Sequence, residues 1–191
     1  MKKRFCKLLY IFISVTLYFF NADANAEMPR VADISVSGIF LSNPESTKKS
    51  FGMSPDFRES SDDFPTVQVC NSDKTEILTL VFHYGDVFDS VSEFRLMRAA
   101  NPPSDCLQLT ERLEHFITGK GVHLGISKKE LVEILGEGFT EQNQTDQMII
   151  RYRIEDGQSG FLRKYNLPIY YGTYSFKGGE LVKAEFGFVY P

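Results

Sequence analysis

The chain repeats one sequence pattern, and a repeat restricts the folds open to it. Residues 38–41 (GIFL) precede a short polar run that ends at Phe51-Gly52, and residues 121–124 (GVHL) precede another that ends at Leu135-Gly136. Each of these stretches is followed later in the chain by a similar hairpin pattern. The corresponding hairpin segments are residues 82–87 with 92–96, and residues 176–181 with 184–188. Self-similarity of this kind predicts two stacked supersecondary units.

The repeat predicts an α+β fold of two tandem units, each with short helices packed on an antiparallel β-sheet. We place the first unit at residues 27–100 and the second at residues 101–191, with Pro102 and Pro103 breaking the chain between them. The second unit has the clearer pattern, with two helices followed by three strands. The mature chain is long enough for one well-cored domain or two small fused ones.

The first unit begins with an extended segment over residues 31–41. Asn43 followed by Pro44 is typical of a helix start, and Gly52 of a helix end, so a short helix is expected between them. Runs rich in β-branched and aromatic residues, separated by turn residues, then predict three strands. These strands are residues 66–70, 77–83 and 91–97.

In the second unit, an apolar stripe predicts a helix over residues 105–118. Ser127 and Glu130 form a capping box, which predicts a second helix that ends before Gly136. Residues 138–147 are polar and are expected to be a loop. Three further strands follow, with a longer insertion at residues 156–164. The expected strands are residues 148–154, 169–176 and 181–190.

The second unit carries a family resemblance. The pattern Gly121-x-x-Leu124-Gly125-x-Ser127-x-x-Glu130, followed by antiparallel strands, resembles a unit of the β-lactamase-inhibitor-protein family. It is also similar to the SmpA/OmlA-type small lipoprotein of the outer-membrane assembly machine. The resemblance implies a helical pair followed by antiparallel strands, and a role in binding other proteins. The chain lacks the lipidated cysteine of the assembly lipoprotein, and no binding residue of the inhibitor has a match here.

The N-terminus is typical of a secretory signal peptide over residues 1–26. Four basic residues precede an apolar run at residues 8–20, and residues 24–26 (ANA) form a small-x-small site, so we expect cleavage after Ala26. The apolar run is too short to cross about 30 Å of hydrocarbon. We therefore expect a periplasmic or secreted chain with no integral membrane segment.

The net charge of the mature chain indicates which class of partner to expect, and its cysteines indicate a disulfide. Removing four basic residues and one acidic residue from totals of 21 and 25 leaves 17 and 24, a formal charge of −7. Acidic proteins are poor ligands for nucleic acid, so we expect no nucleic-acid partner and favour a protein partner, a basic one by charge.

Two cysteines remain, Cys70 and Cys106, and an oxidising compartment makes a disulfide between them the expected state.

The sequence has no recognisable catalytic or metal-binding motif. Its three histidines do not form a zinc-binding pattern, and no nucleophile elbow or phosphate-binding loop is present. Glu93 and Glu185 occupy matching repeat positions and would form an acid/base pair only if they converged; a solvated sheet face is the simpler interpretation. We expect no cofactor, no metal and no catalytic residue, although catalytic groups brought together from distant positions would leave no motif.

Strand alternation sorts the side chains into two faces. The residues expected in the core of the second unit are Ile150, Tyr152, Ile154, Tyr174, Phe176, Val182, Ala184, Phe186 and Phe188. The opposite face is rich in Arg and Tyr, which are favoured at protein interfaces. It becomes one continuous surface only if the sheets of the two units join edge to edge. Its candidate partner-binding residues are His83, Glu93, Arg95, Arg151, Arg153, Tyr171, Lys183 and Glu185.

The sequence thus favours a non-catalytic protein-binding module of the periplasm or cell envelope, similar in role to an inhibitor or immunity protein. The alternative is a structural or assembly module of the envelope. An enzyme without a recognisable motif is a third class, and a deep pocket of convergent polar groups would mark it.

Overall fold

A computed structural model describes residues 28–53, 64–82 and 90–189 of the chain. The expected signal peptide and its cleavage site lie outside these residues. The first described elements are a two-stranded hairpin, β1 (Ser35–Val36) and β2 (Ile39–Phe40), and the helix α2 (Pro44–Phe51). As predicted, Asn43 caps α2 by accepting a hydrogen bond from the Ser46 N–H group at 3.1 Å, and Gly52 ends the helix at φ 72°.

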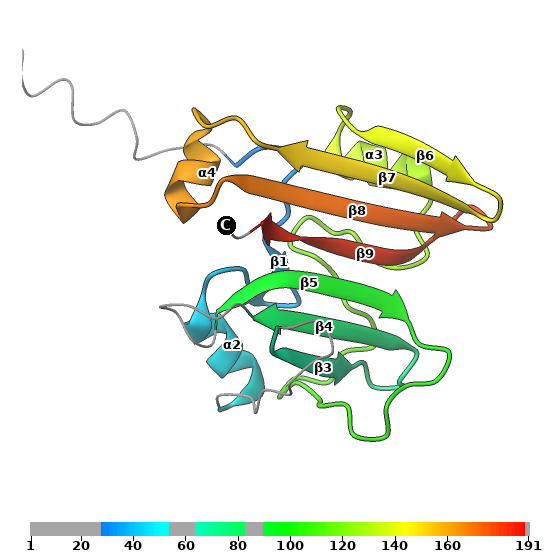
Figure 1. The fold of residues 1–191 in the computed structure, drawn as a ribbon. Coiled ribbons are helices and arrows are strands. Elements are labelled where there is room, and N and C mark those ends of the chain that lie inside the picture. The colour runs from blue at the N-terminus through cyan, green and yellow to red at the C-terminus, as the bar shows by residue number, and fades with distance from the viewer. Residues whose placement is uncertain (1–27, 54–63, 83–89, 190–191) are drawn as a thin grey trace, which may run out of the picture.

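Seven antiparallel strands form one sheet in the order β3-β4-β5-β9-β8-β7-β6 (Figure 1). Those of the first half are β3 (Thr66–Cys70), β4 (Glu76–Phe82) and β5 (Val91–Arg98). Those of the second half are β6 (Thr140–Gln144), β7 (Gln147–Ile154), β8 (Ile169–Lys177) and β9 (Glu180–Val189). Pairing of β5 with β9 joins the two halves edge to edge, which fulfils the condition for a continuous face.

Two helices accompany the second half of the sheet, α3 (Lys128–Leu135) and α4 (Gly160–Tyr165). The capping box of α3 is confirmed: the Ser127 hydroxyl accepts from the Glu130 N–H group, and the Glu130 carboxylate accepts from the Ser127 N–H group. Leu131 and Leu135 are fully buried in the core that lines one face of the sheet. We call the sheet face toward α3 the inner face and the opposite one the outer face.

The inner face is packed with apolar side chains along both halves. In the second half the prediction is confirmed for Tyr152, Tyr174 and Phe186, which are buried. It is wrong for Val182, because the register of β8 and β9 shifts beside Phe176 and places Leu181 in the core instead. A one-residue shift moves every following side chain to the other face, which explains the exchange.

The helix predicted over residues 105–118 is absent. This segment is irregular, and its backbone groups bind neighbouring elements rather than one another. Leu107 exchanges hydrogen bonds with β3 at 2.9 Å each, donating to the Gln68 carbonyl and accepting from the Cys70 N–H group. Further along, Ile117 accepts from the Ser37 N–H group at 2.8 Å. Tertiary hydrogen bonds have replaced the helical ladder.

The α+β class is therefore observed, but two separate tandem units are not confirmed. The second half has four strands, because residues 140–144 of the expected loop form β6. Among the described residues before its strands, the first half has one helix, α2, rather than a helical pair. The insertion predicted at residues 156–164 contains α4, whose Phe161 and Leu162 join the core.

Candidate functional site

The outer face carries two rows of side chains that cross the junction of the half-sheets. Cross-strand pairing aligns them in register, so the members of each row lie side by side on one face. The first row, from β7 to β5, is Arg151, Thr173, Glu185 and Arg95. The second row is Arg153, Tyr171, Gly187 and Glu93. Seven of the eight predicted binding residues lie on this face, and His83 lies outside the described residues.

The charges over β5 and β9 form an ion-pair network. Arg95 binds Glu93 directly and lies 3.9 Å from the Glu185 carboxylate. Lys183 reaches the same Glu185 carboxylate at 2.7 Å. The two glutamates that the repeat aligns are thus both near Arg95, and these groups already neutralise one another. Both carboxylates thus converge on the Arg95 guanidinium within a partly exposed salt-bridge network.

Tyr171 lies at the centre of the face, and Gly187 is its cross-strand neighbour on β9. Because Gly187 has no side chain, the Tyr171 ring can reach across β9 to Glu93 on β5. Burial raises the pKa of Tyr171, and the Glu93 carboxylate, which accepts a hydrogen bond from the phenol, raises it further. Tyr171 therefore stays a neutral donor at physiological pH and connects the two half-sheets.

Gly187 also sets the distance between the half-sheets. A Cβ atom at this position would lie 2.4 Å from the Ser92 carbonyl oxygen and 2.7 Å from the Glu93 Cα atom. Ser92 is the extra residue where the β4–β5 register shifts, since Val81 pairs with Glu93 and Phe82 pairs with Val91. The close approach of this bulge to β9 requires glycine.

A hollow of about 410 Å³ lies over β6, β7 and β8 on the outer face. The charged side chains of its lining are Arg151 and Arg153. Arg151 is oriented by one hydrogen bond, from its Nη1 atom to Gln142 Oε1 at 2.9 Å, and Arg153 binds Glu155 at 2.6 Å. The lining residues are Gly138, Thr140, Arg151, Tyr152, Arg153, Tyr171 and Thr173.

The open part of the outer face is smaller than the alternation predicted. Strand alternation also assigns Thr79 and Val81 of β4 to the outer face, yet both are buried, at 9% and 2% exposure. The accessible surface therefore runs from β5 to β6. Sequence reasoning missed Thr140 and Gln142 because their segment is polar and was interpreted as a loop. The feature of the sequence that could have identified this strand is the turn at residues 145–146, directly before the apolar strand β7.

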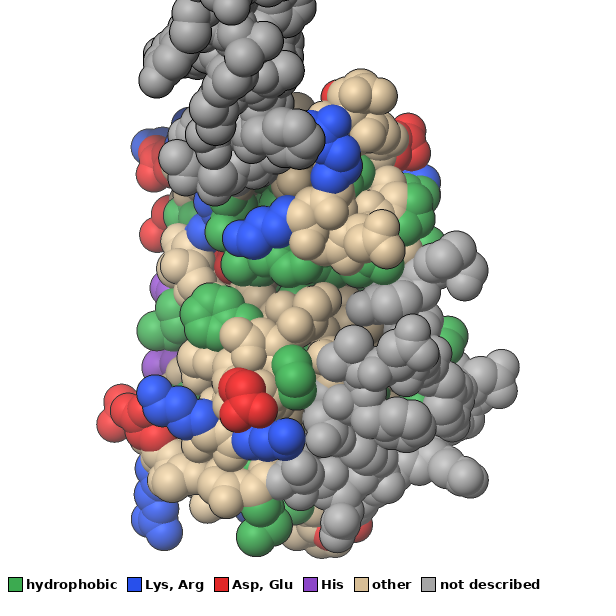
Figure 2. All heavy atoms as spheres, turned by 90° about the vertical axis from the view of Figure 1, so that its left-hand side faces the viewer, with side chains coloured by type: hydrophobic (Ala, Val, Ile, Leu, Met, Phe, Trp, Pro, Cys, Tyr) green, Lys and Arg blue, Asp and Glu red, His purple; other side chains and the backbone are tan. Residues whose placement is uncertain are grey.

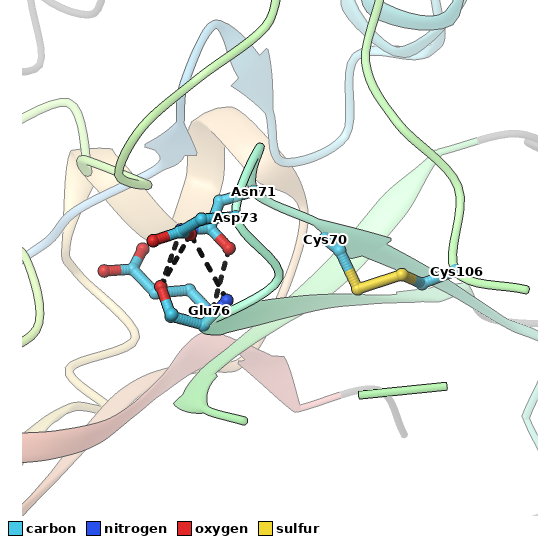
Figure 3. Close-up of a disulfide and its surroundings, with 6 residues drawn as sticks. Cys70, Asn71, Asp73, Glu76 and Cys106 are labelled. Atoms are coloured by element: carbon cyan, nitrogen blue, oxygen red, sulfur yellow. Dashed lines mark hydrogen bonds between the residues drawn. A yellow bond between two sulfur atoms is a disulfide. The ribbon is translucent and has the colours of Figure 1, made fainter. Parts of the chain in front are cut away.

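A separate polar cluster lies where β4 begins, at Glu76, beside the disulfide (Figure 3). The disulfide predicted between Cys70 and Cys106 is confirmed. Next to it, the Asn71 amide accepts from the Glu76 N–H group at 2.9 Å and donates to the Glu114 carbonyl at 2.7 Å. Asn71 thus ties the β3–β4 turn to the irregular segment.

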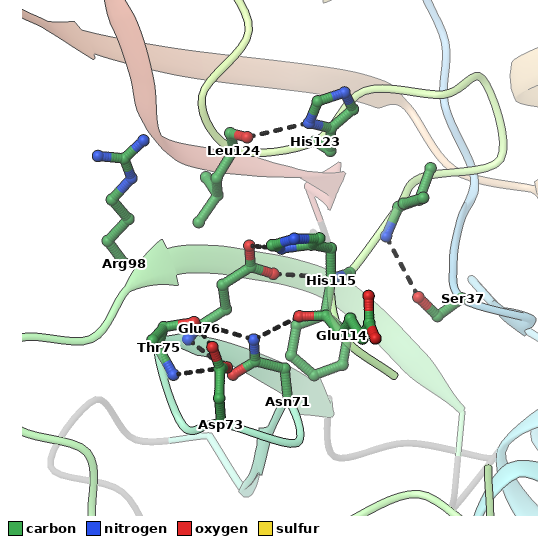
Figure 4. Close-up of polar contacts among 12 residues, drawn as sticks. Ser37, Asn71, Asp73, Thr75, Glu76, Arg98, Glu114, His115, His123 and Leu124 are labelled. Carbon is green, nitrogen blue, oxygen red and sulfur yellow. Dashed lines mark hydrogen bonds and ion pairs between the residues drawn. The ribbon is translucent and has the colours of Figure 1, made fainter. Parts of the chain in front are cut away.

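Glu76 is only 5% exposed and uses both carboxylate oxygens within this cluster (Figure 4). One binds His115 Nδ1 at 2.9 Å, and the other accepts from the Phe116 N–H group at 2.8 Å. His123 binds elsewhere, with its Nδ1 atom 2.9 Å from the Leu124 carbonyl oxygen. The two histidines contact different groups, and Glu76 anchors the segment that the sequence predicted as a helix.

The end of the molecule with α2 and α4 provides a contrast. Figure 2 shows hydrophobic side chains there, scattered among charged and polar ones. Isolated surface hydrophobics are normal on protein surfaces, so these side chains alone do not mark a site. In the described part of the chain, no helix has the length and apolarity needed to cross a membrane.

Comparisons with known proteins complete the description of the site. No protein-family model, no curated protein and no solved structure matches this chain.

Proposed function

We propose that the protein is an extracytoplasmic, non-catalytic binding module that docks a partner protein on the outer face of its sheet. The observation that carries the proposal is the continuity of this face across the β5–β9 junction. It aligns Arg95, Arg151, Arg153 and Tyr171, residue types that are enriched at interface hot spots. A single sheet presents them with little loss of backbone freedom on binding.

The chemistry of the face favours binding over catalysis. The glutamates over β5 and β9 bind Arg95 and Lys183, and the Tyr171 phenol binds Glu93. The groups of the face are thus engaged with one another in a preorganised surface. An inhibitor- or immunity-like role, in which the face covers a site on an enzyme or toxin, fits a rigid surface of this kind.

The disulfide and the N-terminal sequence support an extracytoplasmic compartment. The Cys70–Cys106 bond is typical of an oxidising environment, and the pattern of residues 1–26 is typical of a secretory signal. A partner in the periplasm or cell envelope is consistent with both.

Site-specific photo-crosslinking in native cells tests the proposal. A benzophenone amino acid replaces Thr173 on the outer face, and a matched variant carries it at Lys129, an exposed residue of α3 on the opposite side. We expect one defined protein adduct from position 173 and none of the same mass from position 129. An adduct formed equally from both positions, or only from position 129, would overturn the assignment of the face.

A point variant adds a second readout. Arg151→Ala removes an exposed guanidinium and is expected to weaken the adduct with little change in melting temperature. Tyr171→Ala is unsuitable as a pure binding variant, because it also removes the hydrogen bond to Glu93 across the junction.

A further inference from the structure

We propose that the partner presents an extended acidic segment to the hollow over β6, β7 and β8, with carboxylates two residues apart that bind Arg151 and Arg153. The inference rests on the proposed function and names the chemistry of the docked segment. It differs from the basic partner that the net charge of the whole chain favours, because the local charge of the outer face has the opposite sign.

The outer face carries more cations than carboxylates. Among the described strand residues assigned to it, the four cations are Arg95, Arg151, Arg153 and Lys183, and the two carboxylates are Glu93 and Glu185. Both carboxylates lie over β5 and β9, where Arg95 and Lys183 bind them. Glu155, which follows β7, binds Arg153, so the positive excess is centred on Arg151 at the hollow.

The two arginines keep free capacity for an anion. A guanidinium has five N–H donors. Arg151 uses one donor on the neutral Gln142 and makes no ion pair in the part of the chain that the structure describes. Arg153 binds the exposed Glu155 through Nε. The remaining donors suit carboxylates, which arginine binds in a bidentate manner.

The spacing of the two arginines fits an extended segment. Residues two apart on one face of a strand are separated by roughly 7 Å, and an extended partner segment repeats its side chains at the same interval. Thr140 and Thr173 flank Arg151 in its row and offer hydroxyl groups on either side. A segment with acidic residues at alternate positions would therefore place successive carboxylates on Arg151 and Arg153.

Nucleic acid fits this surface less well. Binding to nucleic acid depends mainly on the neutralisation of phosphates, of which a protein can contact about six to ten. The hollow offers two arginines on a chain whose expected mature charge is −7. A short acidic peptide segment matches two cations, whereas a long polyanion would meet the negative remainder of the molecule.

The test uses two matched peptides and the isotope-labelled mature chain, observed by NMR. The acidic peptide is GEYEYEG, and its neutral counterpart GQYQYQG has the same shape without the carboxylates. We expect the acidic peptide to shift the Arg151 and Arg153 side-chain Nε–H resonances and the Thr173 amide. The neutral peptide loses the charged hydrogen-bonding pairs to both arginines and is expected to bind more than about tenfold more weakly, and added salt should weaken binding of the acidic peptide.

Arg151→Gln is the decisive variant, because it keeps a polar, hydrogen-bonding side chain but loses the charged guanidinium. We expect it to reduce affinity for GEYEYEG by about tenfold, whereas Lys129→Gln on α3 leaves affinity unchanged. Arg151→Lys keeps the charge but loses the planar guanidinium that can bind a carboxylate through two N–H groups, and an intermediate affinity is expected. Unchanged melting temperatures would confirm that each variant is folded.

Three results would overturn the inference. The first is equal binding of both peptides, and the second is an Arg151→Gln variant that binds GEYEYEG as well as the wild type. The third is inorganic phosphate shifting the same resonances at lower concentration than the peptide, which would assign the hollow to a phosphate ligand. If position 173 gives an adduct that Arg151→Gln does not weaken, this inference fails and the proposed function stands. If position 173 gives no adduct, both fail.

Discussion

The β3–β5 half of the sheet ends in an edge that is covered and covalently tied, whereas the β6–β9 half ends in an open edge. On β3, Leu107 pairs with Val69, and the Cys70–Cys106 disulfide fixes the segment that supplies it. On β6, all five residues are exposed and pair with β7 alone among the named strands. An irregular segment can complete a sheet edge where a covalent bond holds it, while a short polar strand can remain uncovered.

The two halves also differ in how their inner faces are filled. The core of the β3–β5 half is mainly aliphatic, with Val67, Val69, Leu78 and Leu80. The core of the second half is aromatic. Phe161 of α4, for example, has its ring 5.6 Å from that of Tyr170 and 5.8 Å from that of Phe188. Aromatic rings bury large areas each, so this half gains much of its stability from packing. The first half depends more on its cross-link.

Loss of the disulfide should have the largest effect. The double variant Cys70→Ser/Cys106→Ser opens a loop whose ends are 36 residues apart, and we expect it to lower the free energy of unfolding by about 2–4 kcal/mol in urea titrations. Hydrogen exchange should accelerate first at the Cys70 and Leu107 positions, while Tyr174 stays protected. Equal acceleration in both halves would show that they unfold as one unit and would remove the contrast.

The junction should be the next most sensitive point. Gly187→Ala drives a methyl group into the Ser92 carbonyl, so β5 and β9 must separate, and we expect a loss of about 1–3 kcal/mol. Gly157→Ala is the matched control, because a Cβ atom there meets nothing within 4 Å and should change stability by less than about 0.5 kcal/mol. Similar urea midpoints for the two variants would mean that the junction tolerates displacement.

Two buried tyrosines of the second half should respond differently to loss of their hydroxyl groups. The Tyr152 hydroxyl donates to the Gly136 carbonyl at 2.8 Å, so Tyr152→Phe is expected to cost about 1 kcal/mol. The Tyr174 hydroxyl is buried without a hydrogen-bond partner among the described residues, so Tyr174→Phe is expected to be neutral or stabilising. Thermal unfolding of both variants measures the difference, and a cost at Tyr174 equal to that at Tyr152 would contradict it.

The sequence predicts those parts of the fold that local chemistry determines. Asn43 and Ser127 mark helix starts because their side chains satisfy free N–H groups, and strict alternation identifies β7 and β8. The segment at residues 105–118 is mispredicted because its apolar spacing is compatible with a helix, while its hydrogen bonds go to residues distant in sequence, such as Gln68 and Glu76. Local patterns do not report such long-range partners.

The candidate site shows the same limit. Alternation places Arg151 and Tyr171 on one face, yet pairing of β5 with β9 decides that this face is continuous. No turn links these two strands, so their adjacency leaves no short-range signal. Gly187 is a sequence feature that hints at this pairing, because a glycine within an apolar strand indicates a close backbone approach. Val182 was assigned to the core because strand alternation carries no information on a register shift.

The smallest predicted effect concerns pH and the covered edge. The hydrogen bond and charge of Glu76 raise the pKa of His115, so the folded state binds this proton more tightly than the unfolded state. The stabilisation is complete below the unfolded pKa of about 6.5 and is lost as pH rises through the raised folded value. His115→Gln should therefore lower stability more at pH 5.5 than at pH 9, as measured by urea unfolding at both values.

The size of this difference should stay below about 1 kcal/mol, because the His115 side chain is 64% exposed and solvent screens the pair. His123→Gln is the matched control, since the His123 ring binds the Leu124 carbonyl rather than a carboxylate. Comparing each variant with the wild type at each pH cancels the titration of other groups, including Asp33, whose burial raises its pKa. A larger effect at pH 9 would mean that neutral His115 is the stabilising form. The covered edge would then be held by its disulfide and its hydrogen bonds, with no stabilising contribution from the charge of His115.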